Sequence, residues 1–355
     1  MDHELRRRAV GERLGSLGAD AVLITELVNV RYLTGFTGSN GQLLLTADGA
    51  TFLTDGRYTE QARHEAPGPA HVTYRRTYRD DLPGLVDGIG RLGFEAHAVT
   101  VEDHGKLAGC VEGVELVPLT DLVERGRRVK DAEELELLRR AQAATDGAFD
   151  RILDAMSVGT SERRTARDLE RLLLDEGADD LAFDPIVAFG ENAAEPHHEP
   201  GHRMLEEGDV IKLDFGARVQ GYHADMTRTV AFGSAPTELR KIHDVVRQAQ
   251  EAGIDAVRAG VTGAEVDAAA RGVIVDAGYG DRFVHGLGHG VGLRIHEAPW
   301  LGLAQENELP AGAVVTVEPG IYVPGVGGVR IEDMVEVTDD GCRVLGASSR
   351  ELIEL

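Results

Sequence analysis

The chain has 355 residues, 42 % of them apolar, so it can build a sizeable core and is long enough for two domains of about 150 residues each. Its formal net charge of −24 argues against a nucleic-acid partner, because such proteins neutralise phosphates with clustered Lys and Arg. No stretch approaches the roughly 18 apolar residues of a membrane span, and no apolar run of signal-peptide length follows the early arginines. We therefore expect a cytoplasmic protein that binds neither nucleic acid nor membrane. Cys110 and Cys342 give no disulfide framework and no C-x-x-C zinc site.

The first third of the chain alternates strand-like and helix-like segments. Short apolar runs predict strands over 21–25, 41–47, 50–55, 71–76 and 114–119. Helical patterns are found over 56–66, 82–93 and 101–110. The Asp48-Gly49 pair predicts a hairpin turn between two of the strands. These elements indicate an α/β domain over residues 1–122, in which we find no catalytic constellation.

A boundary and an internal repeat follow. Residues 123–130 are polar, as is typical of a linker, and a long amphipathic helix begins near Asp131. In the second domain, 131–355, segments 159–178 and 260–279 match at a constant offset of 101 residues (260 − 159). Each is an N-capped helix closed by a glycine; two such helices can look alike by chance, but a long helix also precedes each one. A duplicated domain would place its active site between its halves.

Two acidic residues stand in apolar, strand-like surroundings. Asp214 follows an apolar run, and Asp225 lies eleven positions later (225 − 214), beyond a turn predicted near Gln220-Gly221. A hairpin would bring the two carboxylates together. A buried carboxylate is costly unless it is paired or bound to a metal, although a salt bridge or a turn-capping aspartate would explain either residue alone.

A second acidic pair repeats this pattern. Glu318 ends the apolar run 313–317, and Glu332 lies fourteen positions later (332 − 318), before another strand-like segment. Four convergent carboxylates would repel one another, and two divalent cations would cancel their charge. An imidazole would complete a mixed nitrogen and oxygen site, in which two metals share a bridging hydroxide.

The stretch "HGLGHGVGLRIHE", residues 285–297, contains three histidines and four glycines. It is neither a zinc-protease H-E-x-x-H helix nor a G-x-G-x-x-G nucleotide loop. Its glycines would let backbone and imidazoles crowd around metals and substrate. Taken singly, each histidine would more often be structural or exposed than a ligand.

The order Asp214, Asp225, His289, Glu318, Glu332 resembles the five-ligand signature of the pita-bread metallopeptidases, which include methionine aminopeptidase, aminopeptidase P and prolidase. Segments 28–41 and 51–62 are similar to the amino-terminal domain of aminopeptidase P, prolidase and creatinase. The resemblance covers nearly the whole chain. It implies an α/β (α+β) fold, with a creatinase-like amino-terminal domain followed by a pseudo-twofold pita-bread catalytic domain.

The resemblance also implies roles for single residues. Metal ligands are expected to be Asp214, Asp225, His289, Glu318 and Glu332. Glu318 is also expected to take the proton of the bridging water, and the catalytic histidines without metal are expected to be His197 and His296. Residues that line the substrate pocket or support the site are expected to be His285, Tyr322 and Arg330. Because His198 stands beside His197, the choice between them depends on spacing alone.

The expected function is that of a dinuclear Xaa-Pro aminopeptidase, which releases the residue before a proline by attack of a metal-bridging hydroxide. Its cofactors would be two divalent ions, manganese by family preference or else cobalt or zinc. The substrate would be a peptide with proline second, and the enzyme would be a homodimer. The main alternative is an Xaa-Pro dipeptidase (prolidase), which these motifs do not separate from the aminopeptidase. Further alternatives are a metal-free creatinase-like hydrolase and a non-catalytic peptide-binding relative, both of which would lack the ligands.

Overall fold

The computed structural model describes residues 1–355, which form two compact units, Met1–Arg127 and Arg128–Leu355. The division falls within residues 123–130, and this segment contains the short helix α6 (Glu124–Arg127). No helix of the chain combines the length and the apolar character needed to cross a membrane.

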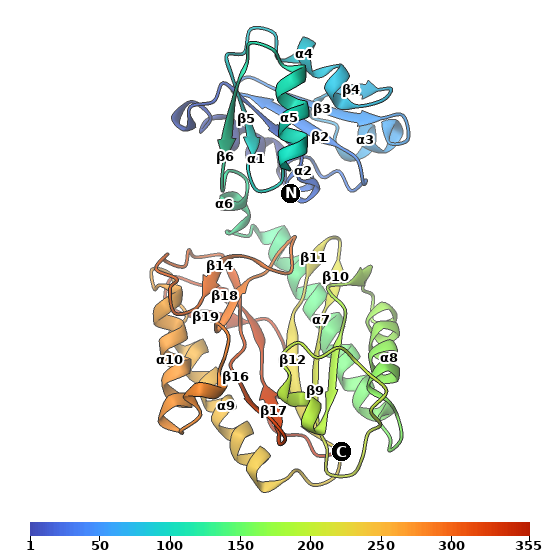
Figure 1. Ribbon diagram of the computed structural model, residues 1–355, viewed down its shortest axis with the longest axis vertical. Helices are drawn as coiled ribbons and strands as arrows, with labels where there is room; N and C mark the ends of the chain where they lie inside the picture. The colour runs from blue at the N-terminus through green and yellow to red at the C-terminus, as the bar shows by residue number, and fades with distance from the viewer. The chain divides into compact units, whose positions relative to one another are not determined.

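The first unit is built on one six-stranded sheet in the order β4-β3-β2-β1-β5-β6 (Figure 1). Its strands are β1 (Ala21–Ile24), β2 (Gln42–Thr46), β3 (Ala50–Asp55), β4 (Ala70–Tyr74), β5 (Arg91–Glu95) and β6 (Glu115–Leu119). Its longer helices are α1 (His3–Gly11), α2 (Leu27–Thr34), α3 (Thr59–Glu65) and α5 (Val101–Cys110). The five strands predicted from the sequence are therefore confirmed, together with the hairpin between β2 and β3.

One predicted helix, over 82–93, is wrong. Only α4 (Leu82–Leu85) is helical there, and the end of the segment belongs to β5, which pairs in parallel with β1 and β6. Glycines explain the difference, because they weaken a helix and Gly88 adopts a φ of +79°. The alternate apolar residues Leu92 and Phe94 then extend the sheet.

The second unit consists of two similar halves. The first half contains α7 (Ala132–Ala155), α8 (Glu162–Asp175), β7 (Asp180–Leu181), β8 (Ile186–Phe189), β9 (Val210–Phe215), β10 (Ala217–Val219), β11 (Tyr222–His223) and β12 (Met226–Ala231). The second half contains α9 (Thr237–Ala256), α10 (Gly263–Asp276), β13 (Gly288–Gly290), β14 (Glu297–Leu301), β15 (Val314–Val317), β16 (Gly320–Val323), β17 (Gly327–Arg330), β18 (Asp333–Val337) and β19 (Cys342–Val344). Figure 1 shows α7 and α8 on one side of the strands and α9 and α10 on the other.

The repeated segments have the same local structure in the two halves. Ser161 caps α8 and Thr262 caps α10, each accepting a hydrogen bond from the backbone N–H three residues later. Each cap also forms an isolated bridge to a later residue, Met204 in the first half and Glu308 in the second. The predicted duplication therefore corresponds to two matching helix pairs, one on each side of the central strands.

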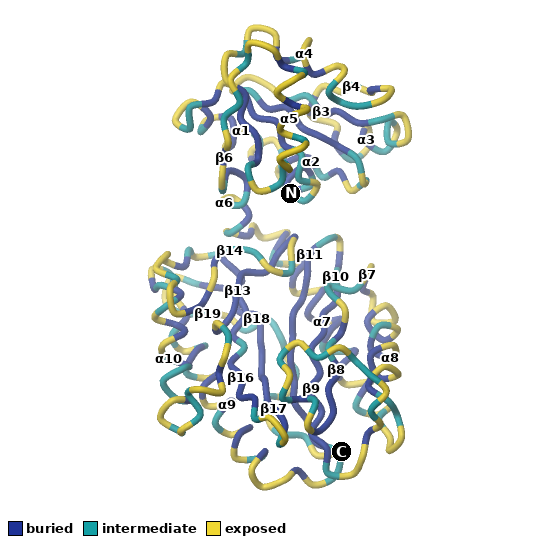
Figure 2. The backbone as a smooth tube through the Cα atoms, in the orientation of Figure 1, coloured by how far each residue is buried: buried dark blue, intermediate teal, exposed yellow.

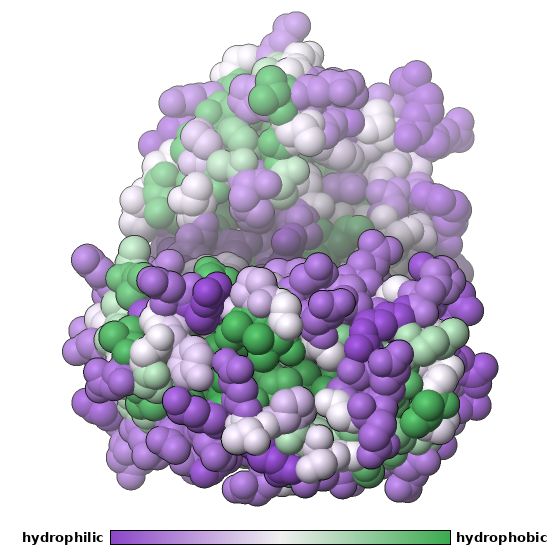
Figure 3. Space-filling model, turned by 60° about the horizontal axis from the view of Figure 1, so that its bottom comes forward, coloured by the Kyte–Doolittle hydropathy of each residue, from purple (hydrophilic) through white to green (hydrophobic).

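Apolar residues from both halves fill the space between helices and strands. One core cluster joins α7 and α8 to β8 and β9, and another joins α9 and α10 to β15 and β18. Figure 2 shows the central strands buried, with exposed residues on the outer helix faces. In the view of Figure 3, hydrophilic residues cover much of the visible surface of this unit, with an apolar area near the centre and smaller apolar groups toward both sides. The acid-bearing strands lie inside this frame.

The core-facing side of α9 contains one histidine, His243, which is 2 % exposed. Burial lowers its pKa from 6.5 to about 4. The pKa of His243 is lower in the folded than in the unfolded protein, so the unfolded chain takes up the proton first as the pH falls. The stability that depends on a neutral His243 is therefore complete above pH 6.5 and is lost as the pH falls toward 4. Between pH 7 and pH 5, protonation of His243 should lower the unfolding free energy of the wild type by about 2 kcal/mol. The His243→Leu variant lacks this group, so its unfolding free energy should fall by about 2 kcal/mol less over the same range. Urea unfolding at both pH values measures this difference, and equal losses in the two proteins would contradict it.

Candidate metal and peptidase site

The first acidic pair is brought together by a hairpin, as the sequence predicts. β9 and β12 pair antiparallel, with Asp214 opposite Thr227, and Asp225 immediately precedes β12. The turn lies at Gln220 and Gly221, which have φ values of +45° and +80°. Both carboxylates are buried, at 7 % and 4 % exposure for Asp214 and Asp225.

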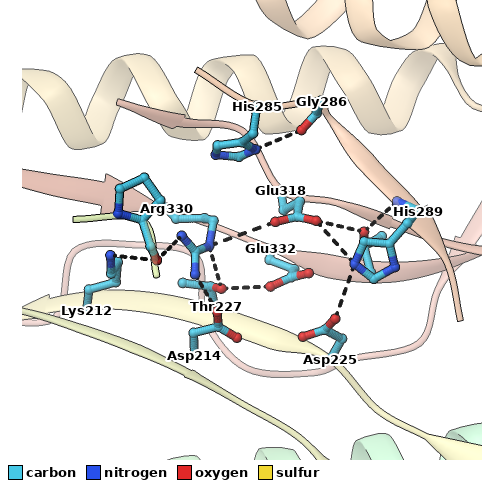
Figure 4. Close-up of polar contacts among 12 residues, drawn as sticks. Lys212, Asp214, Asp225, Thr227, His285, Gly286, His289, Glu318, Arg330 and Glu332 are labelled. Carbon is cyan, nitrogen blue, oxygen red and sulfur yellow. Dashed lines mark hydrogen bonds and ion pairs between the residues drawn. The ribbon is translucent and has the colours of Figure 1, made fainter. Parts of the chain in front are cut away.

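The second pair is held in the same way. β15 and β18 pair antiparallel, with Val317 opposite Asp333. Glu318 follows β15 directly and Glu332 precedes β18 directly, so both acids stand at one end of this strand pair. In each half, therefore, two strand ends carry the acidic side chains into the centre of the unit (Figure 4).

His289 lies on β13 between the two acidic pairs. Its Nε2 atom is 3.5 Å from Oδ2 of Asp225 and 3.4 Å from Oε1 of Glu318. Ligand atoms of Asp225, His289 and Glu332 all lie within 4.8 Å of one another. Burial lowers the pKa of His289 to about 4, so its imidazole is neutral at pH 7 and can offer a lone pair to a metal.

The carboxylates of the site carry more negative charge than their neighbours neutralise. Burial and then the charge of Glu332 raise the pKa of Asp225 well above its ordinary value. Burial and then Glu318 do the same for Glu332, and burial raises the pKa of Glu318 to about 7. Oδ1 of Asp214 and Oε1 of Glu332 are buried without any hydrogen-bond partner. Divalent cations fit this arrangement, because they would supply the missing charge and occupy the unpaired oxygens.

Arg330 is the one cation among these acids, and its side chain is occupied. Nη2 donates to Asp214, Nε donates to Thr227 Oγ1 at 3.0 Å, and Nη1 donates to Tyr322 Oη at 2.8 Å and to the Pro196 carbonyl at 3.2 Å. Four of its five N–H groups are thus used inside the protein. This geometry argues against Arg330 as the cation on which a substrate carboxylate docks.

A cavity of about 690 Å³ opens onto the site. Among the residues that line it are all five expected metal ligands, together with His197, His285, His296 and Arg330. Its apolar wall includes Phe183, Ile186, Ile295, Trp300 and Leu301. Tyr322 is buried and is not among the lining residues, so its contacts suit a supporting role.

The three expected non-ligand histidines differ in their contacts. The ring of His296 packs against that of His289, with centroids 4.4 Å apart. His285 shares a 2.9 Å hydrogen bond between its Nε2 and the hydroxyl of Tyr322. His197 is exposed in the cavity wall.

His198, the neighbour of His197, is directed elsewhere. Its Nε2 is 3.0 Å from Oε2 of Glu162, and its Nδ1 is 2.6 Å from Oε2 of Glu195. It is not among the residues that line the cavity. Of the two adjacent histidines, only His197 is therefore placed to meet a substrate there.

Three polar residues that the sequence analysis did not single out lie beside the acids and hold parts of the site. Thr227 Oγ1 donates to Oε2 of Glu332 at 2.7 Å, and Thr316 Oγ1 accepts from the His289 N–H at 3.0 Å. The third, Lys212, is fully buried and donates to backbone carbonyls of the loop before His197. Each of the three residues lies two positions from an acidic residue along a strand or at its end. Residues two positions apart share one face of a strand, so this spacing could have identified the three residues from the sequence.

Comparison with known proteins covers almost the entire chain. A model of metallopeptidase family M24 matches residues 136–339, and a model of the creatinase/prolidase N-terminal domain matches residues 6–129. The chain is 35 % identical to an Xaa-Pro dipeptidase of Pyrococcus horikoshii over 337 residues, which are 94 % of each chain.

Solved structures resemble the fold over its full length. An Xaa-Pro dipeptidase from Bacillus anthracis matches with a TM-score of 0.98 and 39 % identity over 100 % of both chains. An X-Pro aminopeptidase from Thermotoga maritima matches with a TM-score of 0.91 and 35 % identity, covering 97 % of this chain and 100 % of that one. Proteins of both specificities are thus similar to this chain.

Proposed function

The chain belongs to metallopeptidase family M24, and we propose that within this family it is an Xaa-Pro dipeptidase. The observation that carries this proposal is its similarity, along nearly its whole length, to Xaa-Pro dipeptidases from Pyrococcus horikoshii and Bacillus anthracis. This choice reverses the order expected from the sequence, in which the aminopeptidase came first and the dipeptidase second. The motifs shared by both specificities could not rank them.

We propose that two divalent cations are held by the carboxylates of Asp214, Asp225, Glu318 and Glu332 and the imidazole of His289. The buried, unpaired carboxylate oxygens and the neutral imidazole support this ligand set. Bound divalent metals polarise a carbonyl group and make water available as hydroxide at neutral pH. Manganese is the metal that the family resemblance favours.

The chain's own residues would bind the substrate and move its protons. Glu318, whose carboxylate lies in the cavity wall beside the proposed metals, would accept a proton from the attacking water and return it to the product. His197 and His296, on the cavity wall, would donate hydrogen bonds to the oxygen on which charge develops. A bond to proline is a tertiary amide without an N–H, so the site need not offer an acceptor for one.

Two glycines of the cavity wall allow their segment to pack closely against the neighbouring strands. A side chain at Gly288 would come within 2.1 Å of the Thr316 carbonyl oxygen, and one at Gly286 within 2.7 Å of the Leu301 carbonyl oxygen. Larger residues therefore cannot occupy these positions without moving the neighbouring strand. We propose that the proline ring binds between this wall and His285.

One observation favours the aminopeptidase as a second candidate. The free carboxylate of a dipeptide calls for a cation or several hydrogen-bond donors. Arg330 is the only Arg or Lys that lines the cavity, and it is already bonded to Asp214, Thr227 and Tyr322. A longer peptide would make no such demand, and the X-Pro aminopeptidase from Thermotoga maritima is similar over nearly the full chain.

A peptide panel distinguishes the two candidates. We expect the metal-loaded enzyme to hydrolyse Xaa-Pro with a kcat/KM at least about tenfold above that for Xaa-Pro-Yaa, because a dipeptidase loses its hydrogen bonds to the proline carboxylate when a further residue follows. Xaa-Ala and Xaa-Ala-Yaa serve as controls for proline selectivity. Preference for Xaa-Pro-Yaa would instead identify an aminopeptidase, and preference for the alanine peptides would end the proline-specific proposal.

A further inference from the structure

Lys212 is an ionisable residue in the middle of a buried strand. It lies on β9 between Ile211 and Leu213, which belong to a core cluster, and its own exposure is 0 %. Because side chains alternate along a strand, Lys212 shares the face of Asp214, two positions later. No carboxylate lies within ion-pair distance of its ammonium group. A buried amino group costs stability unless its N–H groups find acceptors, so its retention calls for a specific set of acceptors.

Those acceptors are three carbonyl groups of one short loop. Nζ of Lys212 donates to the carbonyl oxygens of Ala193 at 3.3 Å, of Glu195, and of Pro196 at 3.2 Å. The loop therefore offers as many acceptors as the three N–H bonds that a lysine Nζ can carry. The carbonyl of Pro196 belongs to the peptide bond that enters His197, and Arg330 Nη1 donates to the same oxygen at 3.2 Å (Figure 4).

A buried carboxylate holds the same loop through its N–H groups. Glu162, the first residue of α8, is 0 % exposed and accepts from the backbone N–H of Phe189 at 2.9 Å and of Gly201 at 3.0 Å. It also accepts from Asn192 Nδ2 at 2.8 Å and contacts His198 Nε2 at 3.0 Å.

We propose that Lys212 and Glu162 form a clamp that positions His197 in the cavity, Lys212 by donating hydrogen bonds to the loop and Glu162 by accepting them. Lys212 donates hydrogen bonds to carbonyl oxygens of the loop, and Glu162 accepts hydrogen bonds from N–H groups of the same loop. The loop backbone between these contacts therefore has little freedom to rotate. His198 is drawn toward Glu162, and His197, as its neighbour, projects into the cavity wall. Both clamp residues act through the loop and are positioning residues. The catalytic part of this inference rests on the proposed function, in which His197 contacts the substrate.

A double-mutant cycle tests this coupling. We expect Lys212→Met to reduce kcat about 100-fold, because displacing a catalytic group by about 1 Å costs that much. His197→Ala should cost about 100-fold alone but less than about threefold when added to Lys212→Met. Metal content, measured on each purified protein, should stay at the wild-type value. Full additivity of the two substitutions would overturn the proposal.

His296→Ala provides the matched control for the cycle. Its loop is held by other contacts: Gly292 accepts from the N–H of His223 at 3.0 Å, and Lys130 is paired with Glu297 at 3.0 Å. His296→Ala should therefore cost the same factor with and without Lys212→Met. If His296→Ala and Lys212→Met were as non-additive as His197→Ala and Lys212→Met, Lys212 would act on the whole site. No clamp specific to His197 would then exist.

Glu162→Gln tests the clamp from its other side, away from the acidic centre. Its amide has one acceptor oxygen for the donors that two carboxylate oxygens now serve. We expect the same non-additivity with His197→Ala, and an additive cycle would refute the clamp even if Lys212→Met failed to fold.

Hydrogen exchange separates this inference from the proposed function. In the metal-free protein, amides of residues 190–201 should exchange at least about tenfold faster in Lys212→Met and Glu162→Gln than in the wild type. Residues 289–297 should be unchanged. Unchanged exchange in the loop would refute the clamp, whereas a wild type that cleaves no Xaa-Pro peptide would refute only the proposed function.

Discussion

Asp225→Asn is expected to abolish hydrolysis and to lower the bound metal below wild-type stoichiometry. The substitution keeps the shape of the side chain and removes one negative charge. Asp225 is buried beside Glu332 and His289, so the change affects the centre of the expected ligand set. Loss of an essential metal interaction should reduce kcat/KM by at least about 1,000-fold.

Metal analysis and activity should be measured on the same preparations. Removing metal from the wild type with a chelator should reproduce the loss, and adding divalent metal should restore activity in the wild type but not in Asp225→Asn. Asp276→Asn, at the exposed end of α10, makes the same chemical change away from the site and should keep full activity. Full hydrolysis by metal-stripped enzyme would rule out metal dependence.

The fold could be predicted where the periodicity was regular. The capping residue Asp131 and the apolar spacing after it identified α7, whose capping box the structure contains. The alternation around the Asp48-Gly49 turn likewise identified β2 and β3. Prediction failed over 82–93, where glycines separate a single helical turn from β5. The choice there depends on pairing with β1, a contact distant in sequence.

The acids of the site could be predicted because an acidic residue is conspicuous in an apolar strand. The contacts that arrange them could not be predicted, because they join residues far apart in the chain. Thr227 and Glu332 are 105 positions apart, and Arg330 and Asp214 are 116 apart. Lys212 was as conspicuous in its strand as Asp214, but its partners are backbone carbonyls, which leave no pattern in the sequence.

The two histidines that face each other in the site are expected to fail in different ways when replaced. His289 is 7 % exposed and its Nε2 is directed at Asp225 and Glu318, so His289→Ala should lose both metal and activity. His296 packs on the His289 ring but has no carboxylate within ion-pair distance. His296→Ala should therefore keep wild-type metal content while kcat falls about 100-fold, the usual effect of removing one proton donor or oxyanion ligand. Metal stoichiometry and steady-state kinetics on both variants, with exposed His64→Ala as control, measure the separation. Equal metal loss in the two variants would show that His296 helps to hold the metal, and unchanged kcat in His296→Ala would remove it from the reaction.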